Sequence, residues 1–285
     1  MQTKMNDTIL LVGHGSREKS GNAEIESFAN TWRKRRPDDR IEVCFIEFAD
    51  TLLDAGLNNA AKNSKRVIVV PLILGAAGHV KMEIPHHIAH AREHHPDVEF
   101  IMAKHLGAGT KVFNALKSEL HNAMLALDAP DAKNTGVVLL ARGSSDKVAN
   151  GEIAKMARWL FEESDHDMVD LAFTGITFPK VETVVQRQVA CGMKQVIILP
   201  YYLYTGILIK RIARQVARLS QQYPTISFGL AKYIGFNDAI YELLDERVAN
   251  AQGKGLDEPH MLECDGCKYR DFSEAHGFGH HHHHD

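Results

Sequence analysis

His14, Glu47 and His79 are the residues of this sequence whose types and positions could do chemistry together. Each of them comes at the end of an apolar run or just past it. Neutral imidazoles bind borderline divalent metals and take up protons near pH 7, and a carboxylate accepts protons or orients a histidine. Two histidines and a glutamate also match a hydrolytic zinc site. The residue types alone therefore leave metal hydrolysis and metal delivery both open.

Short apolar strands must position these side chains. Four runs in the first half are apolar almost throughout and rich in Val and Ile, which is typical of parallel strands covered on both faces. Amphipathic stretches at residues 22–36 and 52–63 predict helices between them. Since ligands bind outside the carboxyl ends of the strands in open parallel sheets, we expect the three residues at one rim. The predicted strands are TILLVG (8–13), IEVCFIE (41–47), RVIVVPLIL (66–74) and VEFIMAK (98–104).

The second half of the chain repeats the first. Four runs recur there in the same order, which predicts a duplicated α/β domain. The expected boundaries are an N-terminal half at 1–128 that carries the catalytic residues, a C-terminal half at 134–250, and a flexible tail at 251–285 without core-forming periodicity. The matching runs are TGVVLLARGSS (135–145), LAFTGITFP (171–179), QVIILPYYLYTGILIKR (195–211) and ISFGLAKYIG (226–235).

The two halves differ at the chemically interesting positions. Arg142 stands opposite His14, Gly175 stands opposite Glu47, and an Ile–Leu pair at 207–208 stands opposite the Gly–His pair that contains His79. The halves agree at positions that shape the scaffold, whereas the two histidines and the glutamate occur in the first half alone. The catalytic residues are therefore expected in the first half. The shared positions pair Gly15 with Gly143, Ser16 with Ser144, Pro71 with Pro200 and Lys81 with Lys210.

Composition limits the classes of function. The chain has 285 residues, 45% of them apolar, and a formal net charge of −3, which argues against non-specific nucleic-acid binding. No apolar stretch approaches the roughly 20 residues that span a bilayer, and the N-terminus has no apolar signal region, so we expect a cytoplasmic protein. The ATP-binding pattern G-x-x-x-x-G-K-[ST] is missing. Cys44 and Cys191 lie in apolar runs and are expected to be buried thiols.

The pieces GHGSR after the first run, FIE at the second and VPLILGAAGHVKMEIP at the third resemble the sirohydrochlorin chelatases of the CbiX/SirB type. The likeness covers about residues 8–250. It implies two flavodoxin-like domains that face one another across a cleft, and ATP-independent insertion of Co²⁺ or Fe²⁺ into sirohydrochlorin on the route to cobalamin or sirohaem. The two family histidines match His14 and His79, and Glu47 matches the acidic position.

The implied substrate carries eight carboxylates, so cationic side chains are expected around it. Cobalt is the favoured metal, with iron as the main alternative and nickel also compatible with such ligands. Because the duplication supplies both halves in one chain, a monomer would suffice. The predicted substrate-binding residues are Ser16, Arg17, Lys81, Arg142 and Lys210.

Two further stretches are rich in metal-ligating residues. IPHHIAHAREHHP (84–96) predicts a helix with a buried stripe and with His86, His90 and His94 on the opposite side, either a solvated stripe or a place of metal recruitment. The tail contains a C-x-x-C that supplies two of the four ligands an iron–sulfur cluster usually needs, and a histidine run that is either a metal buffer or a tag. The candidate tail ligands are Cys264, Cys267, His280, His281, His282, His283 and His284.

The residues also permit a protein of another class, a non-catalytic carrier of metal or tetrapyrrole. In such a carrier the tail and the histidine helix would bind the cargo, and His14 would matter little. In a chelatase the reverse is expected: function depends on His14 and little on the tail. A zinc hydrolase is expected to hold its catalytic metal tightly.

Overall fold

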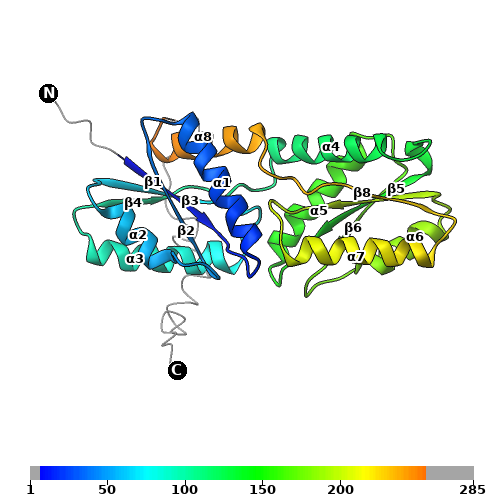
Figure 1. The fold of residues 1–285 in the computed structure, drawn as a ribbon, viewed down its shortest axis with the longest axis horizontal. Helices are drawn as coiled ribbons and strands as arrows, with labels where there is room; N and C mark the ends of the chain where they lie inside the picture. The colour runs from blue at the N-terminus through cyan, green and yellow to red at the C-terminus, as the bar shows by residue number, and fades with distance from the viewer. Residues whose placement is uncertain (1–6, 255–285) are drawn as a thin grey trace, which may run out of the picture. The chain divides into compact units, whose positions relative to one another are not determined.

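The computed structural model describes residues 7–254. Within this range the chain forms two compact units (Figure 1). The first contains the residues up to Leu106 together with those from Tyr241 onward, and the second is Gly107–Ile240. Each unit has a four-stranded parallel sheet with helices on both faces, so the predicted duplicated α/β fold is confirmed.

The sheet of the first unit has the strand order β2-β1-β3-β4. Helices α2 and α3 cover one face, and α1 and α8 cover the other (Figure 1). A π-helical turn, η1, leads directly into α3. The elements are β1 (Asp7–Gly13), α1 (Lys19–Arg35), β2 (Arg40–Phe45), α2 (Leu53–Ala61), β3 (Arg66–Pro71), η1 (His79–Glu83), α3 (Ile84–His94), β4 (Glu99–Met102) and α8 (Asp238–Ala251).

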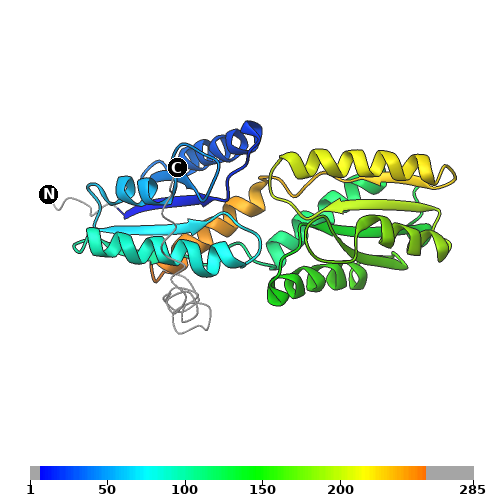
Figure 2. The ribbon, with the colours of Figure 1, turned by 90° about the horizontal axis from the view of Figure 1, so that it is seen from below.

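The sheet of the second unit repeats this order as β6-β5-β7-β8. Figure 2 shows the strands of each sheet, with their flanking helices, from a second direction. A short 3₁₀ turn, η2, precedes the first of these strands. The elements are α4 (Thr110–Leu125), η2 (Ala132–Asn134), β5 (Thr135–Ala141), α5 (Lys147–Glu162), β6 (Met168–Phe173), α6 (Val181–Ala190), β7 (Gln195–Pro200), α7 (Ile207–Gln222) and β8 (Ser227–Leu230).

Strand β1 shows why the central strands read as continuous apolar runs. Ile9, Leu10, Leu11 and Val12 all have 0% of their surface exposed. Leu10 and Val12 belong to the core formed with α2 and α3. Successive side chains of a strand point to opposite faces, so a strand covered on both faces needs apolar residues at every position.

The last helix of each sequence repeat belongs to the other repeat's unit. Helix α4 contacts β7, β8 and α5, and the Phe113 and Trp159 rings meet edge to face with centroids 5.5 Å apart. Helix α8 lies against α1, where the rings of Phe28 and Tyr241 stack at 4.3 Å. The predicted boundaries at 128 and 134 therefore follow the sequence repeat, whereas the compact units exchange its final helix.

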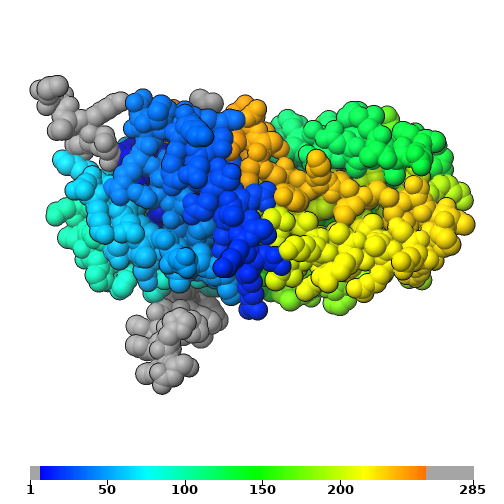
Figure 3. Space-filling model, in the orientation of Figure 1, coloured from blue at the N-terminus to red at the C-terminus, as the bar shows by residue number. Residues whose placement is uncertain are grey.

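Helix α7 illustrates how the second unit presents its charges. Ile212, Val216 and Leu219 are buried, whereas Lys210 and Arg214 are exposed. This helix, yellow in Figure 3, forms a large part of the visible surface of its unit. No helix among residues 7–254 combines the length and the apolar character needed to cross a membrane.

Two local expectations are corrected by the structure. Strand β2 ends at Phe45, so Glu47 lies in the turn that follows and not at the end of the strand. Cys44 is buried as expected, but Cys191 is exposed. Cys191 directly follows α6, and β7 starts only at Gln195.

The contact between α1 and α8 can be tested through Trp32. Its indole is fully buried and donates its Nε1–H to Asp245 Oδ1 at 2.9 Å. We expect Asp245→Ala to lower the free energy of unfolding of the first unit by about 1–3 kcal/mol, because a buried donor loses its partner. Trp32 and Trp159 are the two tryptophans of the chain, so urea unfolding in a Trp159→Phe background reports on the first unit by fluorescence.

Asp245→Asn is the matched control, because it keeps an acceptor for the indole and should recover part of the loss. Equal stability of Asp245→Ala and the parent would mean that this hydrogen bond does not hold α8 in place.

Candidate active site

The strand order places His14 and His79 next to one another. In the order β2-β1-β3-β4, β2 lies on one side of β1, and β3 and β4 lie on the other, so the strand order reverses between β1 and β3. These two strands pair in parallel, with Val12 opposite Pro71. Connections that leave such neighbouring strands diverge to opposite faces and open a crevice at the carboxyl ends. His14 directly follows β1, and His79 begins η1 after β3. The two histidines therefore flank the position where this fold binds ligands.

The loop after β1 holds Glu47 beside His14. Ile46 N–H donates to the carbonyl of Gly13 at 3.0 Å, and Glu47 N–H donates to the carbonyl of His14 at 3.1 Å. Gly15 has a φ of +92°, and a Cβ at this position would lie 1.7 Å from the carbonyl oxygen of Glu47. Only glycine permits so close an approach of the two segments. Gly15, the second glycine of the GHGS motif, thus allows the close approach of the His14 loop to Glu47.

The second unit contains the same loop without the histidine. Ser16 N–H donates to Asn22 Oδ1 at 2.8 Å, and Ser144 N–H donates to Asn150 Oδ1 at 2.9 Å. Each serine Oγ accepts the N–H of the residue two positions later, at 3.1 Å and 3.0 Å. Because a loop without His14 keeps these bonds, Ser16 has a structural role in shaping the turn. Its predicted contact with substrate stays a prediction.

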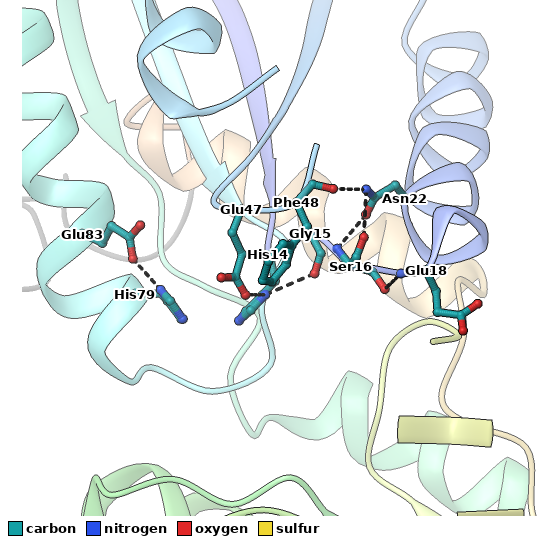
Figure 4. Close-up of polar contacts among 9 residues, drawn as sticks. All are labelled: His14, Gly15, Ser16, Glu18, Asn22, Glu47, Phe48, His79 and Glu83. Atoms are coloured by element: carbon teal, nitrogen blue, oxygen red, sulfur yellow. Dashed lines mark hydrogen bonds and ion pairs between the residues drawn. The ribbon is translucent and has the colours of Figure 1, made fainter. Parts of the chain in front are cut away.

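His14 and His79 form an edge-to-face pair with ring centroids 4.7 Å apart and an interplanar angle of 81° (Figure 4). His14 Nδ1 lies 3.2 Å from the carbonyl oxygen of Gly15 and 3.4 Å from Glu47 Oε1. His79 Nδ1 lies 2.5 Å from Glu83 Oε2. These oxygens can only accept, so each Nδ1 carries the hydrogen and the lone pair of the neutral imidazole is on Nε2.

This arrangement gives each carboxylate the role of an orienting partner. Glu47 and Glu83 approach the Nδ1 atoms, whereas metal or a proton would be taken at Nε2. Within residues 7–254 no three His, Cys, Asp or Glu side chains are grouped to hold a metal ion. The hydrolase alternative required Glu47 as a third metal ligand. Its approach to Nδ1 of His14 favours a carboxylate–imidazole pair instead.

Glu83 is the residue that the sequence analysis missed. The sequence feature that could have identified it is the glutamate of GHVKMEIP, four residues after His79. The π-helical turn, in which the Ile84 N–H donates to the carbonyl of His79, positions the two side chains. Burial by itself raises the pKa of Glu83, but the hydrogen bond and charge of His79, with the charges of His87 and His14, outweigh it. The pKa of Glu83 is therefore below its ordinary value of 4.5.

The remaining predicted residues are distributed over both units. Arg17 lies over the ring of Phe48 at 4.7 Å, next to the His14 loop, and Lys81 lies in η1 between His79 and Glu83. Arg142 follows β5, and Lys210 lies in the first turn of α7. Their contact with substrate carboxylates stays a prediction. The tail candidates Cys264, Cys267 and His280–His284 lie outside the described residues.

Removal of His79 should raise the pKa of Glu83. In His79→Ala the burial of the carboxyl remains, while the strongest opposing interaction is lost. A titration of the side-chain carboxyl carbons by NMR would measure this, with His121→Ala on α4 as the matched control. An unchanged Glu83 titration in His79→Ala would contradict the pairing.

Comparison with known proteins identifies the family of the chain. The CbiX family model matches residues 8–123 and 136–251, which are the two repeats. The sirohydrochlorin cobaltochelatase of Priestia megaterium is 36% identical over 266 residues, 92% of this chain and 84% of the relative. The sirohydrochlorin ferrochelatase of Priestia megaterium is 28% identical over 243 residues, 85% of this chain and 89% of the relative. The solved structure of SirB from Bacillus subtilis with Fe³⁺ has a TM-score of 0.75 and 28% identity, and the match covers 88% of this chain and 98% of that one. The chain therefore belongs to the CbiX family.

Proposed function

We propose that this protein is an ATP-independent chelatase that inserts a divalent metal, with cobalt favoured, into sirohydrochlorin. The observation that carries the proposal is the pair of imidazoles at the carboxyl ends of β1 and β3, each with a carboxylate on Nδ1. The relative at 36% identity is named as a cobaltochelatase and the one at 28% as a ferrochelatase, which supports the substrate and favours cobalt. Insertion of iron is the runner-up.

The metal enters as a substrate of the reaction. A borderline divalent cation bound between two imidazoles and water is held by few protein ligands and is easily passed on. His14 and His79 are the metal-holding residues in this proposal. Their side chains are 18% and 39% exposed, so both are partly accessible to solvent at the carboxyl ends of the central strands.

Insertion exchanges one M²⁺ for two protons. Two pyrrole N–H bonds break as the metal binds the four nitrogens of the macrocycle, and the two protons need acceptors. As the metal leaves, each Nε2 regains its lone pair and takes one proton. The site then holds two imidazolium ions in place of one divalent cation, so its charge is the same before and after. Glu47 and Glu83 stabilise each charge from the Nδ1 side.

The substrate's carboxylates need cationic partners. Arg17 and Lys81 are on the same elements as the two histidines, and Arg142 and Lys210 occupy the corresponding elements of the second unit. We assign carboxylate binding to these four side chains. A monomer without nucleic acid as partner, and a tail that binds a metal or a cluster, remain predictions from the sequence.

The proposal is tested by the absorbance of sirohydrochlorin over time with Co²⁺, and with Fe²⁺ under anaerobic conditions, in the absence of ATP. We expect the enzyme-dependent rate to fall by about 10²- to 10⁴-fold in His14→Ala and in His79→Ala, the usual contribution of a proton acceptor. His121→Ala should match the parent. A parent rate equal to the spontaneous one, with metal or pigment still bound, would favour the carrier.

Glu83 is a positioning residue in this mechanism, because it acts through His79. Glu83→Gln offers an amide that can donate to Nδ1 and so favours the wrong tautomer of His79. We expect kcat to fall by about 10²-fold or more, the pH profile of kcat to change, and the urea midpoint to stay the same. Glu93→Gln on the exposed side of α3 is the matched control. A loss of stability with an unchanged pH profile would assign Glu83 a purely structural role.

A further inference from the structure

Helix α3 and His95, which directly follows it, carry five histidines. The ring of His86 lies near that of His87, with centroids 5.7 Å apart. The other four histidines form two pairs that differ in their partners. His87 Nδ1 lies 2.6 Å from Asp54 Oδ1, and His95 Nε2 lies 2.7 Å from Asn58 Oδ1. Both partners are on α2. These two histidines therefore hold α3 against its neighbouring helix, and their side chains are committed to that contact.

His90 and His94 are arranged differently. Both are exposed, they are one helical turn apart, and their ring centroids are 4.4 Å apart with an interplanar angle of 61°. His94 Nδ1 donates to the carbonyl oxygen of His90 at 2.9 Å. The neutral ring of His94 therefore has its lone pair on Nε2. A backbone carbonyl on one ring nitrogen is the common way in which proteins prepare the other nitrogen for a metal.

We propose that His90 and His94 form a second divalent-cation site, on the outer face of α3. Two histidines at i and i+4 share one helix face and bind a borderline divalent metal together. Metal–nitrogen bonds of about 2.0–2.1 Å place two ligating nitrogens within about 4 Å of one another, a separation that rings 4.4 Å apart reach by small side-chain rotations. Water completes the coordination, which makes the ion exchangeable.

The position of this site relative to His79 suggests its use. Side chains of types that can bind metal follow one another along η1 and α3 at His79, Glu83, His87, His90 and His94, with spacings of three or four residues. Residues at these spacings are neighbours on a helix surface. The outer site thus lies on the same helical surface as the proposed insertion site, roughly 20 Å along it.

An ion held on this surface raises the metal concentration near His79, in the way that a tethered ligand does. This delivery role rests on the proposed insertion function, whereas binding of the cation by His90 and His94 does not. The two parts are therefore tested by separate measurements.

Binding is tested by carbethoxylation of histidines in the full chain, read by mass spectrometry, with and without Zn²⁺ as the probe. Trypsin cleaves after Arg92 and so puts His90 and His94 in different peptides, within which fragment ions separate them from His86, His87 and His95. We expect Zn²⁺ to protect both residues together. In His90→Gln the Zn²⁺ concentration that protects His94 should rise at least tenfold, since loss of an outer-shell partner alone costs about 10- to 100-fold in affinity.

His121 is the internal control, because it is an exposed histidine of α4 with no histidine one turn away. Its modification should not change with Zn²⁺. Two results would overturn the site: full reactivity of His90 and His94 at Zn²⁺ concentrations that protect the histidines of the tail, or unchanged protection of His94 in His90→Gln.

Delivery is tested by insertion kinetics at limiting Co²⁺. His90→Gln with His94→Gln should raise the KM for the metal and leave kcat unchanged, whereas His14→Ala lowers kcat. An unchanged KM in an active enzyme would overturn the delivery role. Absence of any insertion by the parent protein would overturn the proposed function and leave the footprinting result standing.

Discussion

The adjacency of β1 and β3 at the reversal of the strand order is the constraint on which the candidate site depends. Parallel pairing brings the carboxyl ends of these strands together, with Val12 opposite Pro71. The loop after β1 then turns beside Glu47, and the segment after β3 turns into η1 and α3. His14 and His79 are 65 residues apart in the chain, yet their rings are in contact because His14 follows β1, His79 follows β3, and these two strands are neighbours.

The two units separate the scaffold from the chemistry. Both keep the serine–asparagine loop, and both have a backbone hydrogen bond from the turn after the second strand, at Glu47 N–H in one and Gly175 N–H in the other. These bonds use backbone atoms and loop side chains, so they tolerate exchange of His14 for Arg142. The same frame therefore carries an imidazole in one unit and a guanidinium in the other.

Charge balance is the property that connects the site's parts. Each imidazole has a carboxylate on its Nδ1 side, and the two carboxylates offset either one divalent cation or two protons. A histidine pair that can exchange one divalent cation for two protons suits the insertion of metal into a ring that must lose two protons. His94 of the outer pair on α3 has a backbone carbonyl and not a carboxylate as partner, which suits weaker and reversible binding of the same kind of ion.

The sequence by itself determined the strands, the duplication, and the pair His14 and His79, because strands buried on both faces are apolar throughout and the positions after them stand out. Only the tertiary structure decided that Glu83 pairs with His79, that Glu47 lies in a turn, and that α4 and α8 are exchanged between the units. The reason is physical. Periodicity shows that a helix has a face to bury but not which sheet will cover it, and the partner of a ring nitrogen depends on backbone path and rotamer.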